Sequence, residues 1–549
     1  MKEPLLQYEI KVDQPLTPAK IARAILINTG VMAASYSYSM LLLIVTYMIN
    51  QLKDANGSNT LYMAGGTLTI TILDTCVVVS VSGAFLLGYF GTEIFSAIQL
   101  VRKELVQAPQ SINNTKQDEL DRLISQMQNL PSNAMKLAAP FITVSSLFML
   151  SSKYIFEVSG QDPEMLDLIQ WPLMMGAISL PIYAIRFSLE KMLLSAKKQR
   201  FVTALSLFDM GVFGVIPAYV LGFGKWGFPN LKMIGIFIGM LLENIVTTLG
   251  SMAGLHFMKD FEGINFRKNF CKRAERAELR FLFKTAFPII FTIFSEWSAS
   301  VVRNHYAGKI GTDQLAAQNF TTQLCFLIFL IAMALGEAIG LGLKEVSKIV
   351  AEWLKISKEE AKDHIETLKG QANYGKVGLF LGIIITGIIS AFTSYQPDIL
   401  IQFLAPNASP TVQQLGNNIL QKYVGPNAFL YGMAIVMKQS VIAKNNGLWP
   451  SVDYNLAIWA GVLASGLQVF GDDLEGIVRG QILGTGLALL ALLPAVIKSF
   501  FTKTPDQYPK PADSVGYGYV KSLANSLWGK IKSNIWQTPE AGEAHTATP

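Results

Sequence analysis

The sequence predicts an all-α polytopic membrane protein, with twelve transmembrane helices arranged as two pseudo-symmetric six-helix bundles. Three observations support this fold class. Of the 549 residues, 51% are hydrophobic and only 15% are charged, whereas soluble proteins carry about 25% charged residues. The apolar residues gather in runs of about 20 or more, as membrane spans require. The two halves of the chain also contain similar segments in the same order.

The apolar runs are long enough to cross about 30 Å of hydrocarbon as helices. They are continuous and do not alternate at period two, so membrane strands are not expected. Only internally hydrogen-bonded helices satisfy the backbone of such runs in lipid. The predicted spans are 21–50, 61–91, 136–158, 168–195, 203–224 and 231–258 in the first half, and 282–306, 315–343, 374–396, 417–441, 450–470 and 475–500 in the second.

The basic residues of the connections predict the orientation. Lys and Arg concentrate on one side of the predicted membrane, for example in the stretches 266–284 and 344–369. Positive residues favour the cytoplasmic side, so both termini are expected in the cytoplasm and the protein in the cell membrane. The first residues lack a charged region followed by a short apolar core, so no cleaved signal peptide is expected.

The internal repeat predicts the domain organisation. Similar segments recur at an offset of about 243–250 residues, such as LLSAKKQ at 193–199 and SVIAKNN at 440–446. Parallel repeats with a site at their interface are typical of transporters. We therefore expect an N-lobe at 1–258, a basic linker at 259–281, a C-lobe at 282–500 and a cytoplasmic tail at 501–549. Residues 104–135 are expected to form a long polar loop.

Several functional classes are disfavoured by missing patterns. The sequence has no nucleotide-binding G-x-x-x-x-G-K-[ST] loop and no G-x-S-x-G nucleophile motif. Its four histidines are isolated, so no metal site is expected. The net charge of +6 lies mostly between the apolar runs and does not indicate nucleic-acid binding. The chain is thus expected to be neither an enzyme nor a cofactor-binding protein.

Ionisable residues inside the apolar runs are the first candidates for a functional site, because a charge at membrane depth is costly unless it is paired or hydrated. Glu296 lies about fourteen residues into the seventh span, past its midpoint. It is expected to exchange a proton for a sodium ion or a cationic substrate; alternatively, it is a buried carboxyl that bonds to Ser295 and Ser298. Asp74, in the threonine-rich second span, is either a coupling acid or a polar helix contact.

Five further charged residues within the spans are candidates. Asp209 is a candidate gating or snorkelling residue in the fifth span. Glu243 in the sixth span is expected to pair with Asp209 through a shared proton, or with Arg186 as a salt bridge. Arg186 is alternatively a contact for an anionic substrate. In the second half, Glu337 and Lys438 are candidates for a binding site or for an ion pair with each other.

Two stretches resemble the multidrug and toxic compound extrusion (MATE) transporters. The segment LGFGKWGFPNLKMIGIFIG at 221–239 is similar to the family's short glycine- and proline-containing loop before the sixth span. The segment 283–324 is similar to the family's seventh span and the start of its eighth, with Pro288, Glu296 and the LAAQ sequence. LYMAGGTLTI at 61–70 is a weaker match.

The resemblance implies two six-helix bundles in a V shape that alternate between outward-open and inward-open states. It also implies efflux of organic, often cationic compounds, driven by entry of sodium ions or protons. The chain departs from the family at two acidic positions. The first span reads SYSYSMLLLIVTYMINQ and has no acid, and the tenth has Tyr431 or Gly432 where many members have an Asp. Glu296 alone remains of the usual acids.

These features together predict a secondary active transporter that exchanges H⁺ or Na⁺ for small organic compounds. The substrate and the ion are expected to compete for acids in the cleft, Glu296 first. We expect a monomer whose partners are the substrate, the ion and membrane lipids. Two alternatives remain open: a lipid or lipid-linked oligosaccharide flippase of the same superfamily, and a non-transporting receptor or scaffold that kept the fold.

Overall fold

The computed structural model describes residues 17–35, 37–54, 57–107, 113–196, 198–258, 261, 276–354, 365–445 and 449–501, and it contains helices but no strands within these ranges. The helical segments of the first half are α1 (Pro18–Ser35), α2 (Ser37–Asn50), α3 (Thr60–Gln107), α4 (Asn113–Val158), α5 (Pro163–Ser195), α6 (Gln199–Asp209), the π-helical η1 (Met210–Val215), α7 (Ile216–Phe223) and α8 (Lys232–Phe257). Those of the second half are α9 (Arg276–Ile310), α10 (Thr312–Leu354), α12 (Ile365–Tyr395), α13 (Pro397–Leu404), α14 (Pro410–Ile419), η3 (Leu420–Val424), α15 (Gly425–Asn445), α16 (Trp449–Gly466), α17 (Leu474–Val496) and η4 (Ile497–Phe501).

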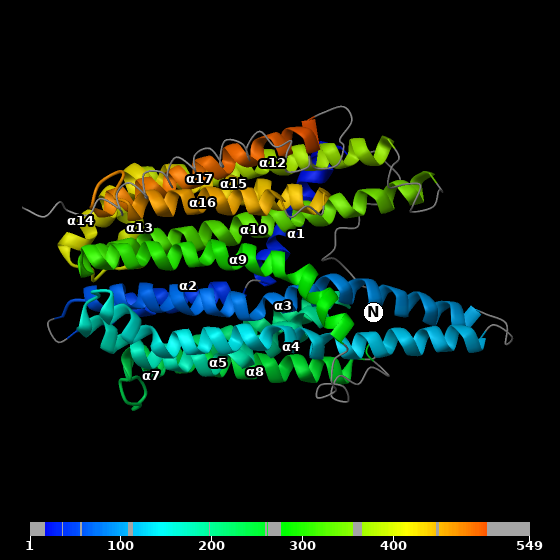
Figure 1. Cartoon of the computed structure of the whole chain (residues 1–549), viewed down its shortest axis with the longest axis horizontal. Coiled ribbons are helices and arrows are strands. Elements are labelled where there is room, and N and C mark those ends of the chain that lie inside the picture. Colours follow the sequence, from blue (N-terminus) through cyan, green and yellow to red (C-terminus); the bar gives the residue numbers. More distant parts are fainter. Residues whose placement is uncertain are drawn as a thin grey trace, which may run out of the picture.

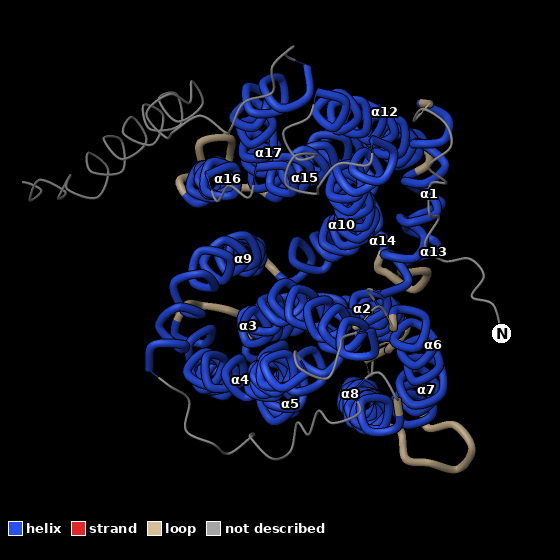
Figure 2. Tube along the Cα trace, turned by 90° about the vertical axis from the view of Figure 1, so that its right-hand side faces the viewer, coloured by secondary structure: helices blue, strands red, loops and turns tan. Residues whose placement is uncertain are grey.

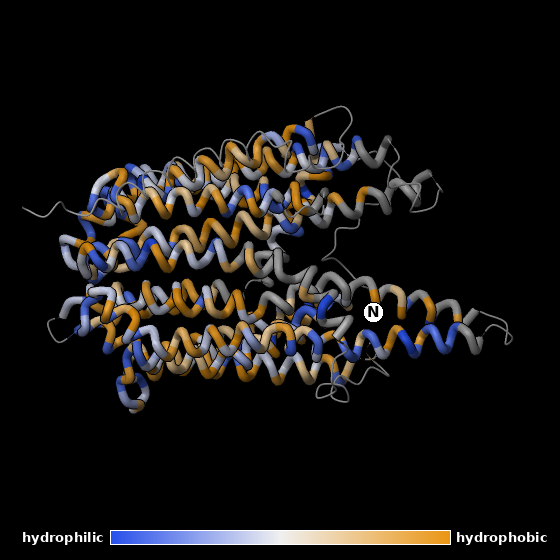
Figure 3. Tube along the Cα trace, in the orientation of Figure 1, coloured by the Kyte–Doolittle hydropathy of each residue, from blue (hydrophilic) through white to orange (hydrophobic). Residues whose placement is uncertain are grey.

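The predicted all-α polytopic membrane fold is confirmed. Each predicted span lies on a single helix or on consecutive helical segments; the fifth, for example, comprises α6, η1 and α7. Within the described ranges, eight helices are long and apolar enough to cross a membrane. Figure 3 shows apolar residues along the middle of the helices and hydrophilic residues gathered towards their ends.

The prediction of a polar loop at 104–135 is wrong. Helix α3 continues to Gln107 and α4 begins at Asn113, so most of this segment is helical. The two helices extend beyond the bundle as a hairpin, seen at the right of Figure 1. Most of the predicted linker at 259–281 and nearly all of the predicted tail at 501–549 lie outside the described residues.

The helices form two bundles that lie side by side along their length (Figures 1 and 2). One contains α2 to α8 and the other α10 to α17, with α9 packing against α3 of the first bundle and α16 of the second. Helix α1 belongs by sequence to the first half but packs against α10 and α12. Its residues Ile21, Ala24 and Ile25 are buried in the apolar core of the second bundle.

Polar side chains join the two halves of the chain towards the end of the molecule where α2 ends at Asn50 and α3 begins at Thr60. Asn304 Nδ2 donates to Thr71 Oγ1 at 2.8 Å, and Asn319 Nδ2 donates to Thr67 Oγ1 at 2.6 Å. Closer to the loops, Thr312 Oγ1 donates to Asp162 Oδ2. We call this end of the molecule, defined by these contacts, the closed end. Its bonds are between side chains of the two halves, so they can break when the bundles move apart.

Close packing between α16 and α17 depends on glycine. A Cβ atom added to Gly461 would lie 2.3 Å from the backbone oxygen of Gly480 and 2.8 Å from Cα of Gly484. Small residues let transmembrane helices approach each other closely. We expect Gly461→Ala to destabilise the protein by about 1–3 kcal/mol, because the helices must separate. The measurement is the apparent melting temperature in detergent. Gly387→Ala is the control, since no atom lies within 4 Å of its added Cβ; an equal loss in both variants would contradict this account.

Candidate functional site

A buried ion cluster lies inside the first bundle. Arg186 of α5 donates from Nε to Glu190 Oε1 at 2.9 Å and from Nη1 to Glu243 Oε2 of α8 at 2.7 Å. Arg186 is 1% exposed and Glu243 is 0% exposed. Of the two pairings predicted for Glu243, the salt bridge with Arg186 is the one present. We call these three residues the Arg186 cluster; it joins α5 to α8 through a buried charged contact.

Asp209 lies beside the Arg186 cluster, at the junction of α6 and η1, and makes no salt bridge to Arg186 among the described residues. Its side chain is buried, and Oδ2 has no hydrogen-bond partner among the described residues. No hydrogen bond joins it to Glu243 within the described part of the chain. Thr247 Oγ1 donates to Glu243 Oε1 at 3.4 Å, and its side chain is also within hydrogen-bonding reach of Asp209. π-helical turns are frequent at functional sites, and Asp209 immediately precedes this one.

Asp74 is a buried acid in the middle of α3 and is 2% exposed. Its Oδ2 has no hydrogen-bond partner in the part of the chain that the structure describes. The neighbouring hydroxyls do not supply one, because Thr71 Oγ1 donates to the carbonyl of Thr67 and Thr75 Oγ1 to the carbonyl of Thr71. No salt bridge to Asp74 occurs among the described residues. Asp74 thus shares with Asp209 the lack of a salt bridge and of a full set of hydrogen bonds among the described residues.

Glu296 of α9 has two partners in the second bundle. Lys438 Nζ of α15 donates to Oε2 at 2.8 Å, and the Tyr454 hydroxyl of α16 donates to Oε1 at 2.8 Å. The Lys438 ammonium also lies 4.0 Å from the centre of the Tyr454 ring. The alternative bonds predicted from Ser295 and Ser298 are not made: Trp459 Nε1 donates to Ser295 Oγ, and Ser298 Oγ donates to the Ser295 carbonyl.

The prediction that Glu337 and Lys438 pair with each other is wrong, because Lys438 binds Glu296 instead. Glu337 is partly buried on α10 and makes no ion pair within the described residues. Tyr431 lines a pocket beside Glu296. It stands near the position at which many MATE transporters have an Asp in the tenth span. The structure thus brings Glu296, Lys438 and Tyr431 together and leaves Glu337 apart from them.

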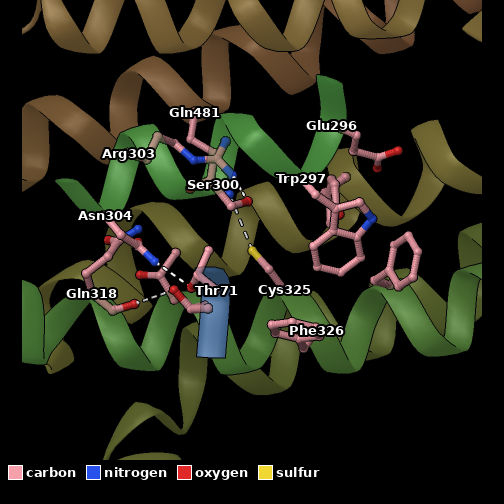
Figure 4. Close-up of a pocket in the computed structure, with 14 residues that line it drawn as sticks. Thr71, Glu296, Trp297, Ser300, Arg303, Asn304, Gln318, Cys325, Phe326 and Gln481 are labelled. Atoms are coloured by element: carbon pink, nitrogen blue, oxygen red, sulfur yellow. Dashed lines mark hydrogen bonds between the residues drawn. The ribbon is translucent and has the colours of Figure 1, made fainter. Parts of the chain in front are cut away.

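That pocket lies where the two bundles meet. Most of its lining comes from α9 and α10, with Tyr431 of α15, Gln481 of α17 and Thr71 of the first bundle. Figure 4 shows Trp297 and Phe326 on one side and Arg303, Ser300 and Asn304 on the other. The bond from Asn304 to Thr71 forms part of its wall, so the pocket adjoins the closed end. An opening of that contact would change access to the pocket.

Three residues around the pocket were missed by the sequence interpretation. Arg303 and Gln481 line it, and Tyr454 hydrogen-bonds to Glu296. Arg303 has a detectable signal, because Glu296, Ser300 and Arg303 are spaced four and three residues apart and share one face of α9. Nothing in the sequence distinguishes Tyr454 or Gln481 from packing residues.

No family model matches this chain. Curated relatives are similar to part of it. A probable multidrug resistance protein NorM of Rhizobium meliloti (strain 1021) is 28% identical over 207 residues, which are 37% of this chain and 41% of the relative. A probable NorM of Synechocystis sp. is 24% identical over 291 residues, 53% of this chain and 59% of the relative. The chain thus spans about half the length of the curated relatives it matches.

Solved structures are similar over most of the chain. The inward-facing conformation of a multidrug resistance MATE family transporter of the MOP superfamily has a TM-score of 0.63 at 12% identity, covering 89% of this chain and 96% of that one. The eukaryotic MATE transporter AtDTX14 has a TM-score of 0.62 at 11% identity, covering 93% and 99%. At these identities the likeness concerns the fold.

Proposed function

We propose that this chain, a relative of the MATE transporters with the MATE fold, is a secondary active transporter that exports small organic compounds in exchange for H⁺ or Na⁺. The NorM relatives carry names that describe multidrug resistance. A fold of two bundles with a pocket between them suits alternating access, in which the bundles close first one end and then the other.

The observation that carries the coupling part of the proposal is Asp74. A buried carboxylate without a cation or a full set of hydrogen bonds is costly, and a proton or a bound cation removes that cost. Glu296 and Glu243 already have cationic partners in Lys438 and Arg186. Asp74 and Asp209 both lack a salt bridge among the described residues, and we assign the coupling ion to Asp74 because it lies next to the contact between the bundles. Thr71, one turn before it on α3, lines the pocket and accepts a hydrogen bond from Asn304 of α9.

We place the protein in the plasma membrane as a monomer with both termini in the cytoplasm. The closed end then faces outward, and the structure corresponds to a state closed to the outside. Binding of the ion at Asp74 would act on the neighbouring Thr71 contact between the bundles. The membrane potential supplies about 2.3 kcal/mol per charge for each 100 mV, and each pH unit about 1.4 kcal/mol, so one or two ions per cycle support export.

The test is flux in proteoliposomes that contain the purified full-length chain, with a pH gradient or a sodium gradient imposed separately. The probes are a cationic and an anionic fluorescent dye, rhodamine 123 and fluorescein. We expect one gradient to drive dye movement and thereby identify the ion. In Asp74→Asn, gradient-driven flux is expected to fall to the level of protein-free liposomes, while dye-for-dye exchange continues.

Asp118→Asn is the matched control, because it also removes one carboxylate, from an exposed position of α4. It should leave both kinds of flux unchanged. Unaltered gradient-driven flux in Asp74→Asn would exclude Asp74 as the coupling acid. Failure of the unmodified protein to exchange either dye would contradict the transporter proposal and favour a scaffold that kept the fold.

A further inference from the structure

Arg303 is a cation in the pocket without an acidic partner. Within the residues that the structure describes, its side chain makes one hydrogen bond, from Nη2 to Ser300 Oγ at 2.8 Å, and no salt bridge. The two other basic residues deep in the bundles, Arg186 and Lys438, are both paired with glutamates. An unpaired guanidinium at membrane depth is costly, and it is usually retained where it serves a function.

The acid nearest to Arg303 along α9 does not neutralise it. Glu296 is bonded to Lys438 and Tyr454, and Figure 4 shows its carboxylate directed away from the Arg303 guanidinium. Glu296 and Arg303 are the charged side chains among the described residues that line the pocket. Once Lys438 is counted against Glu296, the pocket retains one positive charge. It therefore attracts an anion and repels an organic cation.

The rest of the lining supplies hydrogen bonds and an aromatic surface. Thr321 is 1% exposed and Gln481 is 3% exposed, yet Thr321 Oγ1 and Gln481 Oε1 have no hydrogen-bond partner among the described residues. The Trp297 ring lies 5.2 Å from the ring of Phe326 and 5.2 Å from that of Phe329, centre to centre. Buried polar groups without partners are rare, and beside an unpaired guanidinium they offer hydrogen bonds to a polar ligand. The cavity measures about 40 Å³, so it has to widen when the bundles move apart in order to admit an aromatic one.

We propose that the pocket binds an aromatic organic anion, whose carboxylate, sulfonate or phosphate is held by Arg303 and whose ring lies against Trp297, Phe326 and Phe329. This names the substrate class and so rests on the proposed transport function. A guanidinium presents parallel N–H donors that match two oxygens of such a group. The same anionic chemistry occurs on soluble compounds and on lipid headgroups, and the proposal extends to both sources.

The test is direct binding to the purified full-length chain in lipid nanodiscs, measured by fluorescence anisotropy without any gradient. Fluorescein and rhodamine 123 serve as probes because they share a xanthene ring and carry opposite charges. We expect fluorescein to bind more tightly than rhodamine 123. Arg303→Gln is expected to weaken fluorescein binding about tenfold to a hundredfold, the usual effect of losing a charge-assisted hydrogen bond. The affinity of Arg303→Lys for fluorescein should lie between that of the unsubstituted protein and that of Arg303→Gln.

Arg122→Gln is the control, since it removes an exposed arginine of α4 and should not change binding. Retained binding in Arg303→Lys shows that position 303 tolerates substitution without loss of the fold. Displacement of fluorescein by benzoate assigns the site to soluble anions, and displacement by dihexanoyl phosphatidic acid assigns it to lipid headgroups. Displacement by neither, tighter binding of rhodamine 123, or unchanged fluorescein binding in Arg303→Gln would each overturn the proposal.

Failure of this inference can be told apart from failure of the transport function. Fluorescein binding without flux in proteoliposomes would support the anion site and contradict the transport function. Gradient-driven flux of rhodamine 123 without fluorescein binding would support the transport function and contradict the anion site.

Discussion

Arg186→Met is expected to destabilise the protein by about 3–5 kcal/mol, because it leaves two carboxylates in the interior of the first bundle without a cation. Glu190 and Glu243 both bond to Arg186, at 2.9 and 2.7 Å, and Glu243 has no exposed surface. The measurement is the apparent melting temperature of the detergent-solubilised protein. We expect a large decrease relative to the unsubstituted chain, together with a lower yield of folded protein.

The control for this experiment is a chemically similar pair at the surface. Arg479 and Glu475 are also four residues apart on one helix and 3.1 Å from each other, but the Arg479 side chain is 44% exposed. Exposed pairs contribute about 0–1 kcal/mol, so Arg479→Met should change the melting temperature little.

A further variant separates the charge from the shape of Arg186. Combining Arg186→Met with Glu190→Gln and Glu243→Gln removes all three charges, and we expect this protein to recover most of the lost stability. If the triple variant were as unstable as Arg186→Met, the loss would come from packing of the arginine stem and not from unpaired acids.

The positions of the spans were predictable because each segment that crosses the hydrocarbon must satisfy its own backbone hydrogen bonds. A run such as 231–258 must form a helix wherever it lies in the bundle, and α8 occupies Lys232–Phe257. The extent of α3 and α4 was not predictable in the same way. Beyond the hydrocarbon the helices continue in water, where polar residues such as those before Pro131 carry no hydrophobic signal. The sequence alone consequently predicts a loop at 104–135.

The pairing of the buried charges depends on packing that the sequence does not encode locally. Lys438 lies 142 residues from Glu296 and about one hundred from Glu337, and a sequence interpretation gives no reason to prefer the distant partner. The resemblance to MATE transporters identified the fold and directed attention to Glu296. It did not identify Arg303, whose proposed role rests on the absence of a salt bridge to it among the described residues. That absence is visible only when the neighbours are placed in three dimensions.

We expect the protein to lose stability when either Glu296 or Lys438 is replaced alone. Glu296→Gln leaves the Lys438 ammonium with only the Tyr454 ring, and Lys438→Met leaves the Glu296 carboxylate with only the Tyr454 hydroxyl. Each single substitution is therefore expected to cost about 3–5 kcal/mol, as for other broken buried pairs. The double variant, which keeps neither charge, should be more stable than either single variant. Because each single variant loses about 3–5 kcal/mol and the double variant loses less than either, we expect the coupling energy of this double-mutant cycle to exceed about 3 kcal/mol, the upper end of the usual range.

The same double variant decides which acid couples transport to the ion. Loss of flux in Glu296→Gln alone is ambiguous, since an unpaired Lys438 also perturbs the second bundle beside the pocket. In the double variant the Glu296 carboxylate is removed without leaving the Lys438 ammonium unpaired. If Asp74 carries the coupling ion, this protein should retain gradient-driven flux in the proteoliposome assay. If it retains dye-for-dye exchange but loses the dependence on the gradient, Glu296 is the coupling acid, and the role assigned to Asp74 is wrong. The buried pair would then have to open during each cycle, with the ion replacing Lys438 at the carboxylate.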